Sequence, residues 1–395
     1  AYIVIRHFNM HFCFVEIGYP RPSGVIGGAG TYVHHHSKQL TKMNHDVTVI
    51  CGKMDNDTSS FSDGEVLVYP IIVPEKISYY LGKIPFIRVF SKTINYLING
   101  LRVYFLLNKI NLNKRIDVIE YSEGGDFWNS ITKKFSYVAH LHGSSYTFKQ
   151  NSGKKIDYSD KMQRKLEHYF IKNADLVLSP CEAMVKIVET EMKVNLNAEI
   201  IPYSMDLKYF HNISRRNFIP NKSKVSILFA SRNDAVKGGE LLVESMRILN
   251  HSFHSSIKVD FYGYSPKQNT SDLDFLQLHD FVPEDELMLA YKNADICVIP
   301  SLFDNSPYTV YEAMANGNIV VASAVGGIPE IVGDSSNGFL FTNSDASDLS
   351  KKLTNAIELI LSGDDIPLRK NAQNRIISLA NINNNVEKWL KFTKV

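Results

Sequence analysis

Cysteine is scarce in this sequence of 395 residues, and no two cysteines form a CxxC pair. The four that are present, Cys13, Cys51, Cys181 and Cys297, lie far apart, and three of them sit inside short apolar runs. Metal centres and disulfide frameworks use closely spaced cysteines, so we interpret these residues as reduced thiols in the core. Reduced thiols fit a cytoplasmic protein.

Long apolar runs and a strong excess of charge are also missing. No run reaches the roughly 18 residues needed to span a bilayer, and no signal peptide opens the chain. Lysine plus arginine (43) nearly balances aspartate plus glutamate (41), a net charge of +2 that does not suit a bulk nucleic-acid binder. We expect a folded cytoplasmic protein without a nucleic-acid partner. Because Met10 leads into the first apolar run, residues 1–9 are expected to be an added extension.

The length predicts two or three domains, and the hydrophobic pattern indicates two. Short apolar runs alternate with amphipathic segments, which is typical of parallel sheets with helical crossovers. The pattern restarts after a polar stretch at 211–223. We predict strands at 12–15, 47–51, 66–73, 118–121, 137–140 and 176–178, and then at 225–230, 258–262, 296–299, 319–322 and 339–341. The predicted domains are 1–210 and 211–380, and a helix in 381–395 is expected to cross back to the first domain.

Glycine is concentrated after the first predicted strand, in Gly27-Gly28-Ala29-Gly30. A glycine turn before a helix lets backbone N–H groups approach a phosphate or a sugar, although a turn that simply needs glycine is equally consistent. The neighbouring His34, His35 and His36 resemble metal ligands. Adjacent helical residues point about 100° apart, however, and cannot converge on one ion.

The segment 300–332 carries the strongest chemical signal. Ser306 and Pro307 predict a helix start, with Ser306 as the N-cap and Pro307 at the first helical position. Gly317 is expected to end this helix. Asp304 lies just before it and Glu312 on it, and a carboxylate among apolar neighbours needs a partner.

Two cations, Arg232 and Lys237, follow the first strand of the second domain, with Gly238 and Gly239 beside them. Ligands of open α/β sheets bind at the carboxyl ends of the strands. A diphosphate clamp is therefore one interpretation, and solvated loop cations are the other.

Taken together, these residues resemble glycosyltransferase family 4, whose members are retaining enzymes of GT-B architecture that use nucleotide sugars. The family's paired-glutamate motif corresponds here to Asp304 and Glu312, and the match continues through the glycine turn at 326–332. His142-Gly143 and the pair Arg232 and Lys237 fall in the family's order. Three features depart from the pattern: Asp304 replaces a glutamate, Ser231 replaces a glycine, and Tyr203-Ser204 replaces an asparagine-glycine pair.

The resemblance implies two Rossmann-like parallel-sheet domains that face each other across a cleft. It implies His142, Arg232, Lys237 and Asp304 as catalytic residues, with His142 near the anomeric carbon, the cations on the diphosphate and Asp304 on a sugar hydroxyl. Glu312 would contact the ribose. The implied donor-binding residues are Gly27, Gly28, Arg232, Lys237, Asp304, Asn305, Ser306, Pro307, Tyr308, Thr309 and Glu312. Fixed cations would replace a metal, so we expect no metal or other cofactor.

Two alternatives share the same motifs. A nucleotide-sugar 2-epimerase of the same architecture would need no acceptor, and a non-catalytic partner of another transferase would not turn over. Two Asp-x-Asp triplets, at 55–57 and 272–274, suit a metal-dependent transferase, but neither adjoins the proposed clamp, and we interpret both as solvated loop acids.

Residues 76–115 contain lysines, arginines and aromatic residues but no aspartate or glutamate. Such a composition suits an anionic membrane surface. We therefore expect peripheral attachment to the inner membrane face and a glycan or lipid-linked acceptor. The alternative is an ordinary helix whose leucines, such as Leu101 and Leu107, lie in the core while its lysines face solvent.

Overall fold

A computed structural model describes residues 9–19, 27–52, 59–71, 83–84, 89–206, 224–249 and 251–393. The chain divides into two compact units, Ala1–Ser204 with Ile382–Val395, and Met205–Asn381. The sequence-based domain limits lie at 210 and 380. Most of the predicted extension at 1–9 and all of the polar stretch at 211–223 lie outside the described residues.

Unit 1 is built on a sheet with the order β3-β4-β2-β1-β5-β6-β7-β8, in which only the β3–β4 pairing is antiparallel. Its strands are β1 (His11–Val15), β2 (Asp46–Gly52), β3 (Phe61–Asp63), β4 (Val66–Ile71), β5 (Val118–Ser122), β6 (Tyr137–His140), β7 (Leu176–Ser179) and β8 (Ala198–Ile200). Its helices are α1 (Gly28–Lys42), α4 (Ser91–Asn113), α5 (Phe127–Thr132), α6 (Ser145–Asn151), α7 (Tyr158–Lys172), α8 (Glu182–Met192) and α16 (Ile382–Thr393).

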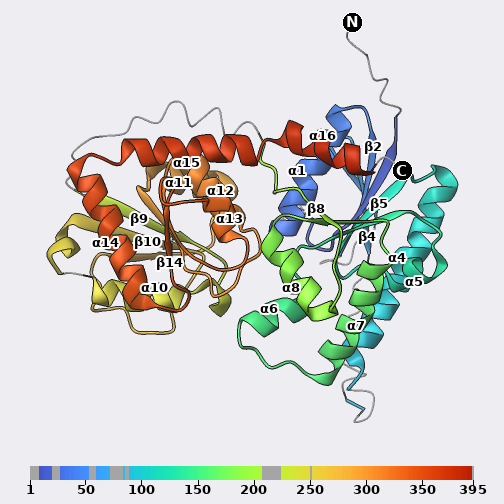
Figure 1. Ribbon diagram of the computed structural model, residues 1–395, viewed down its shortest axis with the longest axis horizontal. Helices are drawn as coiled ribbons and strands as arrows, with labels where there is room; N and C mark the ends of the chain where they lie inside the picture. Colours follow the sequence, from blue (N-terminus) through green and yellow to red (C-terminus); the bar gives the residue numbers. More distant parts are fainter. Residues whose placement is uncertain are drawn as a thin grey trace, which may run out of the picture. The chain divides into compact units, whose positions relative to one another are not determined.

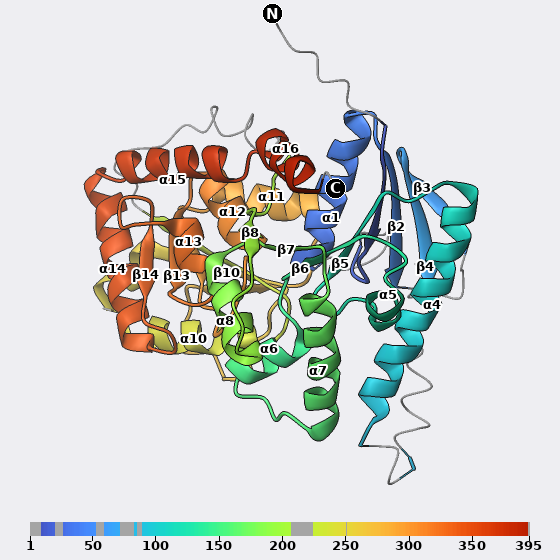
Figure 2. The ribbon, with the colours of Figure 1, turned by 45° about the vertical axis from the view of Figure 1, so that its right-hand side comes forward.

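The two faces of this sheet have separate helical covers, because successive side chains of a strand point to opposite sides. Cys13 and Ile119 pack in a core with Leu107 of α4. Phe12, which precedes Cys13 in β1, points to the other side of the sheet, where its ring centroid is 4.9 Å from that of Trp389 in α16. Helix α16 lies beside α1 (Figure 1), and α4 covers the sheet face opposite α1 (Figure 2).

Unit 2 contains a fully parallel sheet with the order β11-β10-β9-β12-β13-β14. Its strands are β9 (Val225–Ala230), β10 (Ile257–Tyr262), β11 (Leu276–His279), β12 (Ile296–Ile299), β13 (Ile319–Ser323) and β14 (Phe339–Phe341). Its helices are η1 (Ala235–Lys237), α10 (Gly239–Ile248), η2 (His251–Ser256), α11 (Glu284–Asn293), α12 (Tyr308–Ala315), α13 (Ile328–Val332), α14 (Ala346–Ser362) and α15 (Ile366–Leu379). Strands such as Ile296–Ile299 are buried throughout, as expected for parallel strands covered on both faces.

The prediction of two α/β units with parallel sheets is confirmed, and all four cysteines are buried as expected. Gly28, Ala29 and Gly30, which we expected in a turn, form the first turn of α1 instead. Gly30 is needed for packing, since a Cβ there would lie 1.9 Å from the carbonyl oxygen of Gly18. None of the described helices combines the length and the apolar character that crossing a bilayer requires.

Candidate active site

The carboxyl ends of β9 and β12 bring Lys237 and Asp304 together in unit 2. These strands are neighbours in the sheet, so the loops that follow them meet at one edge. The Nζ atom of Lys237 lies 2.6 Å from Oδ2 of Asp304, and the hydroxyl of Ser301 donates to the same oxygen at 3.3 Å. The sequence predicted both residues for the donor site but not their ion pair.

Two glycines with positive φ allow the loops to pack this closely. Gly238 has φ +73°, and a Cβ on it would lie 1.8 Å from the carbonyl oxygen of Pro300. Gly326 has φ +52°, and a Cβ there would lie 1.7 Å from the carbonyl oxygen of Asp304. Any side chain at either position would push the loops apart, so these glycines fix the backbone around the ion pair.

The start of α12 differs from the prediction. The helix begins at Tyr308, and its N-cap is Pro307 without a side-chain cap, so Ser306 does not cap it. The Ser306 hydroxyl instead lies 3.0 Å from that of the buried Tyr311. The predicted cap was wrong because a buried hydroxyl partner was available one turn further along the chain. Gly317 follows the helix with φ +70°, as expected for a helix end.

The other predicted donor-site residues of unit 2 differ in exposure. Asn305, Ser306, Pro307 and Tyr308 are buried, Thr309 and Glu312 are half-buried, and Arg232 is exposed. Burial raises the pKa of the Glu312 carboxyl to about 7. Around neutral pH, Glu312 therefore exists in both its protonated and its ionised form.

Unit 1 holds His142 at the carboxyl end of β6. Its Nδ1 atom is 2.5 Å from the hydroxyl of Tyr203, a hydrogen bond that fixes the ring. Burial, followed by the neighbouring His140, holds the pKa of His142 well below its ordinary value, so the imidazole is neutral. Tyr203 is one of the departures from the family pattern, and that departure was the available signal for this contact. Gly27, at the N-cap of α1, and Gly28 also belong to this unit.

His142 belongs to a buried cluster of potential metal ligands. Within the described part of the chain, Glu120, His140 and His142 form a group whose potential ligand atoms all lie within 4.8 Å of one another. Oε1 of Glu120 already pairs with Nδ1 of His140 at 2.9 Å, and Oε2 accepts the Trp389 indole N–H at 2.5 Å. The two histidine rings stack at 4.0 Å with an interplanar angle of 26°. Imidazole binds metals in its ring plane, and nearly parallel rings do not aim at one point. We therefore interpret the cluster as a packing support for His142, which stacks on the ring of the hydrogen-bonded His140.

The Asp-x-Asp triplets are only partly visible. The triplet at 55–57 lies outside the described residues. In the other, the Asp272 carboxylate accepts from Nε of Arg247 at 2.7 Å on the surface. This contact agrees with the interpretation of a loop acid.

Two family models match successive parts of the chain. The model of Glycosyltransferase Family 4 matches residues 26–209, and the model of Glycosyl transferases group 1 matches residues 211–376. Among curated proteins, D-inositol 3-phosphate glycosyltransferase of Corynebacterium jeikeium (strain K411) is 28% identical over 240 residues, 55% of this chain and 56% of that protein. The match thus spans about half the length of this relative.

Solved structures resemble the whole chain at low identity. Sucrose-phosphate synthase from Thermosynechococcus elongatus superposes with a TM-score of 0.73 at 18% identity, covering 97% of this chain and 98% of that one. Anabaena Alr3699/HepE, solved in complex with UDP, gives a TM-score of 0.63 at 16% identity, with 97% and 99% covered. These likenesses show a GT-B fold made of two Rossmann-like units.

Proposed function

Because the chain belongs to glycosyltransferase family 4, we propose that it is a retaining glycosyltransferase that moves a sugar from a nucleotide-sugar donor to a hydroxyl of a glycan or lipid-linked acceptor. Cell-surface polysaccharide or glycolipid synthesis on the cytoplasmic side of the membrane is the proposed setting. The observation that carries this proposal is the contact between Lys237 and Asp304, a cation for a diphosphate beside a carboxylate for a sugar hydroxyl.

The proposed chemistry follows from the charges of these groups. Breaking the bond between sugar and nucleotide leaves negative charge on the diphosphate, which Lys237 and Arg232 would stabilise more strongly in the transition state than in the ground state. A neutral His142 adds no positive charge and can accept or donate a hydrogen bond beside the reacting sugar. No metal takes part in this scheme.

The decisive experiment is a panel of nucleotide sugars, with released nucleotide measured with and without a lipid-linked acceptor. A transferase is expected to release nucleotide faster with the acceptor, and to do so in excess EDTA. Acceptor-independent release with an altered free sugar would instead identify an epimerase. A complete lack of turnover would favour a non-catalytic partner, and activity lost in EDTA but restored by magnesium or manganese would contradict the metal-free scheme.

Glu312 predicts a pH dependence of nucleotide binding. An ionised carboxylate accepts hydrogen bonds with both oxygens and therefore suits two ribose hydroxyls better than the protonated acid. Since burial raises the pKa of Glu312 to about 7, affinity for the nucleoside diphosphate is expected to increase as pH rises from below to above this value, with proton release on binding. Calorimetry in buffers of different ionisation enthalpy measures both quantities.

The matched variant is Glu312→Gln, which keeps the shape of the side chain but cannot titrate. This variant should bind the nucleoside diphosphate more weakly and should lack the proton release from residue 312. Protons released by the nucleotide's own phosphate are measured equally in both proteins. Equal proton release in the two proteins would show that Glu312 does not contact the bound nucleotide.

One exposed face of α4 supports the proposed membrane contact. Arg102, Phe105, Lys109 and Leu112 are spaced three or four residues apart and so share a side of the helix. Phe105 is 64% exposed and Leu112 is 87% exposed, while the opposite side of α4, including Leu107, is buried. Cations alternating with exposed apolar side chains suit an anionic headgroup layer.

Two cations elsewhere in the predicted segment form ion pairs with acidic residues. Lys92 contacts Asp157 and Asp160, and Lys114 pairs with Asp46. Within 76–115, the stretches 76–82 and 85–88 lie outside the described residues. The proposed contact rests on the exposure of the face formed by Arg102, Phe105, Lys109 and Leu112.

Sedimentation with liposomes tests this face directly. The wild-type protein is expected to bind anionic vesicles more strongly than zwitterionic ones, and less at physiological than at low salt, because each basic group contributes about 1 kcal/mol near the surface. The variant Arg102→Glu/Lys109→Glu should lose this preference, whereas Lys351→Glu/Lys370→Glu, at two exposed lysines of unit 2, should keep it. Equal binding of both variants would remove the membrane contact and leave the transferase proposal intact.

A further inference from the structure

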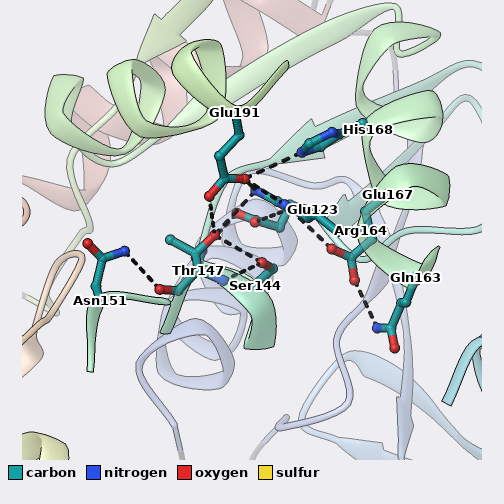
Figure 3. Close-up of polar contacts among 10 residues, drawn as sticks. Glu123, Ser144, Thr147, Asn151, Gln163, Arg164, Glu167, His168 and Glu191 are labelled. Atoms are coloured by element: carbon teal, nitrogen blue, oxygen red, sulfur yellow. Dashed lines mark hydrogen bonds and ion pairs between the residues drawn. The ribbon is translucent and has the colours of Figure 1, made fainter. Parts of the chain in front are cut away.

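Arg164 of α7 is a fully buried cation in unit 1, at 3% exposure. Three glutamates from different segments surround its guanidinium group: Glu123, Glu167 and Glu191 (Figure 3). Its Nη1 atom is 2.9 Å from Glu123 and 3.1 Å from Glu167, and its Nη2 atom is 2.6 Å from Glu191. A buried guanidinium with this many partners is rigidly placed.

Glu123 extends this network to the turn that follows His142. One carboxylate oxygen of Glu123 binds Arg164, and the other accepts the Gly143 backbone N–H at 2.9 Å. Gly143 has φ +98°, and a Cβ there would lie 2.8 Å from the ring of Phe148. Only glycine fits this turn, so the backbone N–H is the group through which the protein can hold residue 143.

The other end of the same segment is tied to the same guanidinium. Nη2 of Arg164 donates to the hydroxyl of Thr147 at 3.3 Å. The backbone N–H of Thr147 in turn donates to the side chain of Ser144, the N-cap of α6. Gly143 through Glu123 and Thr147 directly are thus both fixed by Arg164, which leaves the turn after His142 little freedom.

The three glutamates are not equivalent in this network. Glu123 alone accepts the backbone N–H of the turn, whereas Glu167 uses its second oxygen for the side chain of Gln163, at 2.9 Å. Three carboxylates face one guanidinium, and burial raises the pKa of Glu167. Loss of the Glu167 charge should therefore be tolerated, while Glu123 has a geometric task that Glu167 lacks.

We propose that Glu123 and Arg164 are positioning residues that hold the Gly143 turn, and through it the neighbouring His142, in the geometry that the transfer step requires. Their role in transfer rests on the proposed function, whereas the statement that Glu123 and Arg164 fix the Gly143 turn is independent of it. Misplacing a reacting group by a fraction of its contact distance lowers the rate of the chemical step more than it lowers binding. Loosening the turn should therefore reduce kcat while leaving the donor's KM nearly unchanged.

The test compares Glu123→Gln with Glu167→Gln, two identical changes around the same guanidinium. Arg164 and the Gly143 N–H donate to different oxygens of Glu123, so a glutamine at 123 would place an NH2 donor against one of these two donors. Hydrogen exchange of peptides covering 141–148 is expected to accelerate at least about tenfold in Glu123→Gln and to stay near wild type in Glu167→Gln. With a donor from the panel, kcat should fall at least about tenfold in Glu123→Gln alone, with KM changed by less than about twofold.

Two further variants keep the inference testable if Glu123→Gln folds poorly. Glu123→Asp retains the charge but is too short for both contacts, and Thr147→Val removes the hydroxyl at the other end of the segment. Both should accelerate exchange in 141–148 while circular dichroism stays native. Similar exchange in the Glu123 and Glu167 variants would overturn the inference. A wild-type protein that turns over no nucleotide sugar would count against the proposed function, and exchange would still decide whether Glu123 holds the turn.

Discussion

Replacing Lys237 with alanine is expected to lower turnover at least about tenfold at saturating donor, which corresponds to about 1.4 kcal/mol of transition-state stabilisation. Lys237 is half-buried and already contacts Asp304, so its charge is screened less by solvent than that of a surface lysine. The same minimum loss is expected for Arg232→Ala. Steady-state nucleotide release measures kcat for each variant, and near wild-type turnover in both would remove the diphosphate clamp.

Two further variants test whether the effect is specific to the Lys237–Asp304 pair. Lys292→Ala removes an exposed lysine from the last turn of α11 and should leave turnover unchanged. Asp304→Asn removes the carboxylate that neutralises Lys237, so it should strengthen binding of the nucleoside diphosphate alone while weakening binding of the intact donor. Equal losses of affinity for both ligands would show that Asp304 does not recognise the sugar.

Replacing Trp389 with alanine is expected to destabilise unit 1 by about 3–5 kcal/mol, the usual range for a fully buried tryptophan. Trp389 is completely buried, its ring packs on Phe12 and Phe14, and its N–H donates to Glu120. The alanine variant leaves a cavity and removes a hydrogen bond from a buried carboxyl group. Urea unfolding followed by circular dichroism measures the shift of the unit 1 transition.

Two substitutions separate the parts of this effect. Trp389→Phe keeps most of the packing but loses the donor to Glu120, so a loss of about 1–2 kcal/mol is expected. Phe392→Ala, at a half-buried position of the same helix, should cost less than Trp389→Ala. If Trp389→Ala shifted the transition no more than Phe392→Ala, the packing of α16 on the sheet would not depend on this residue.

The sequence predicted best those strands that are buried on both faces. The runs at 137–140, 225–230 and 296–299 match β6, β9 and β12 residue for residue. Their side chains are almost all apolar, because helices cover both sides of each sheet. The missed strands, β3, β8 and β11, lie at sheet edges and are partly exposed, so they carry polar residues and leave no continuous apolar run.

In the candidate site, too, the sequence predicted local features but not contacts between distant segments. Local patterns placed Lys237 and Asp304 at the carboxyl ends of two strands, but their contact joins residues 67 positions apart and depends on β9 and β12 being neighbours. The hydrogen bond between His142 and Tyr203 spans 61 positions and has the same character. Strand order is a property of the whole domain, so no local motif encodes these pairs. Ser306 was misassigned for a related reason, since its buried partner Tyr311 is recognised only once the helix is packed.

The return of α16 to unit 1 sets an order of assembly during synthesis. Trp389 donates to Glu120 across 269 positions of the chain, and the whole of unit 2 is made between them. Domains generally fold as units, in the order in which they leave the ribosome. Unit 1, although its strands emerge first, must therefore wait until unit 2 has been synthesised before α16 can cover its part of the Phe12 side of the sheet, beside α1. The unit that begins first is completed last.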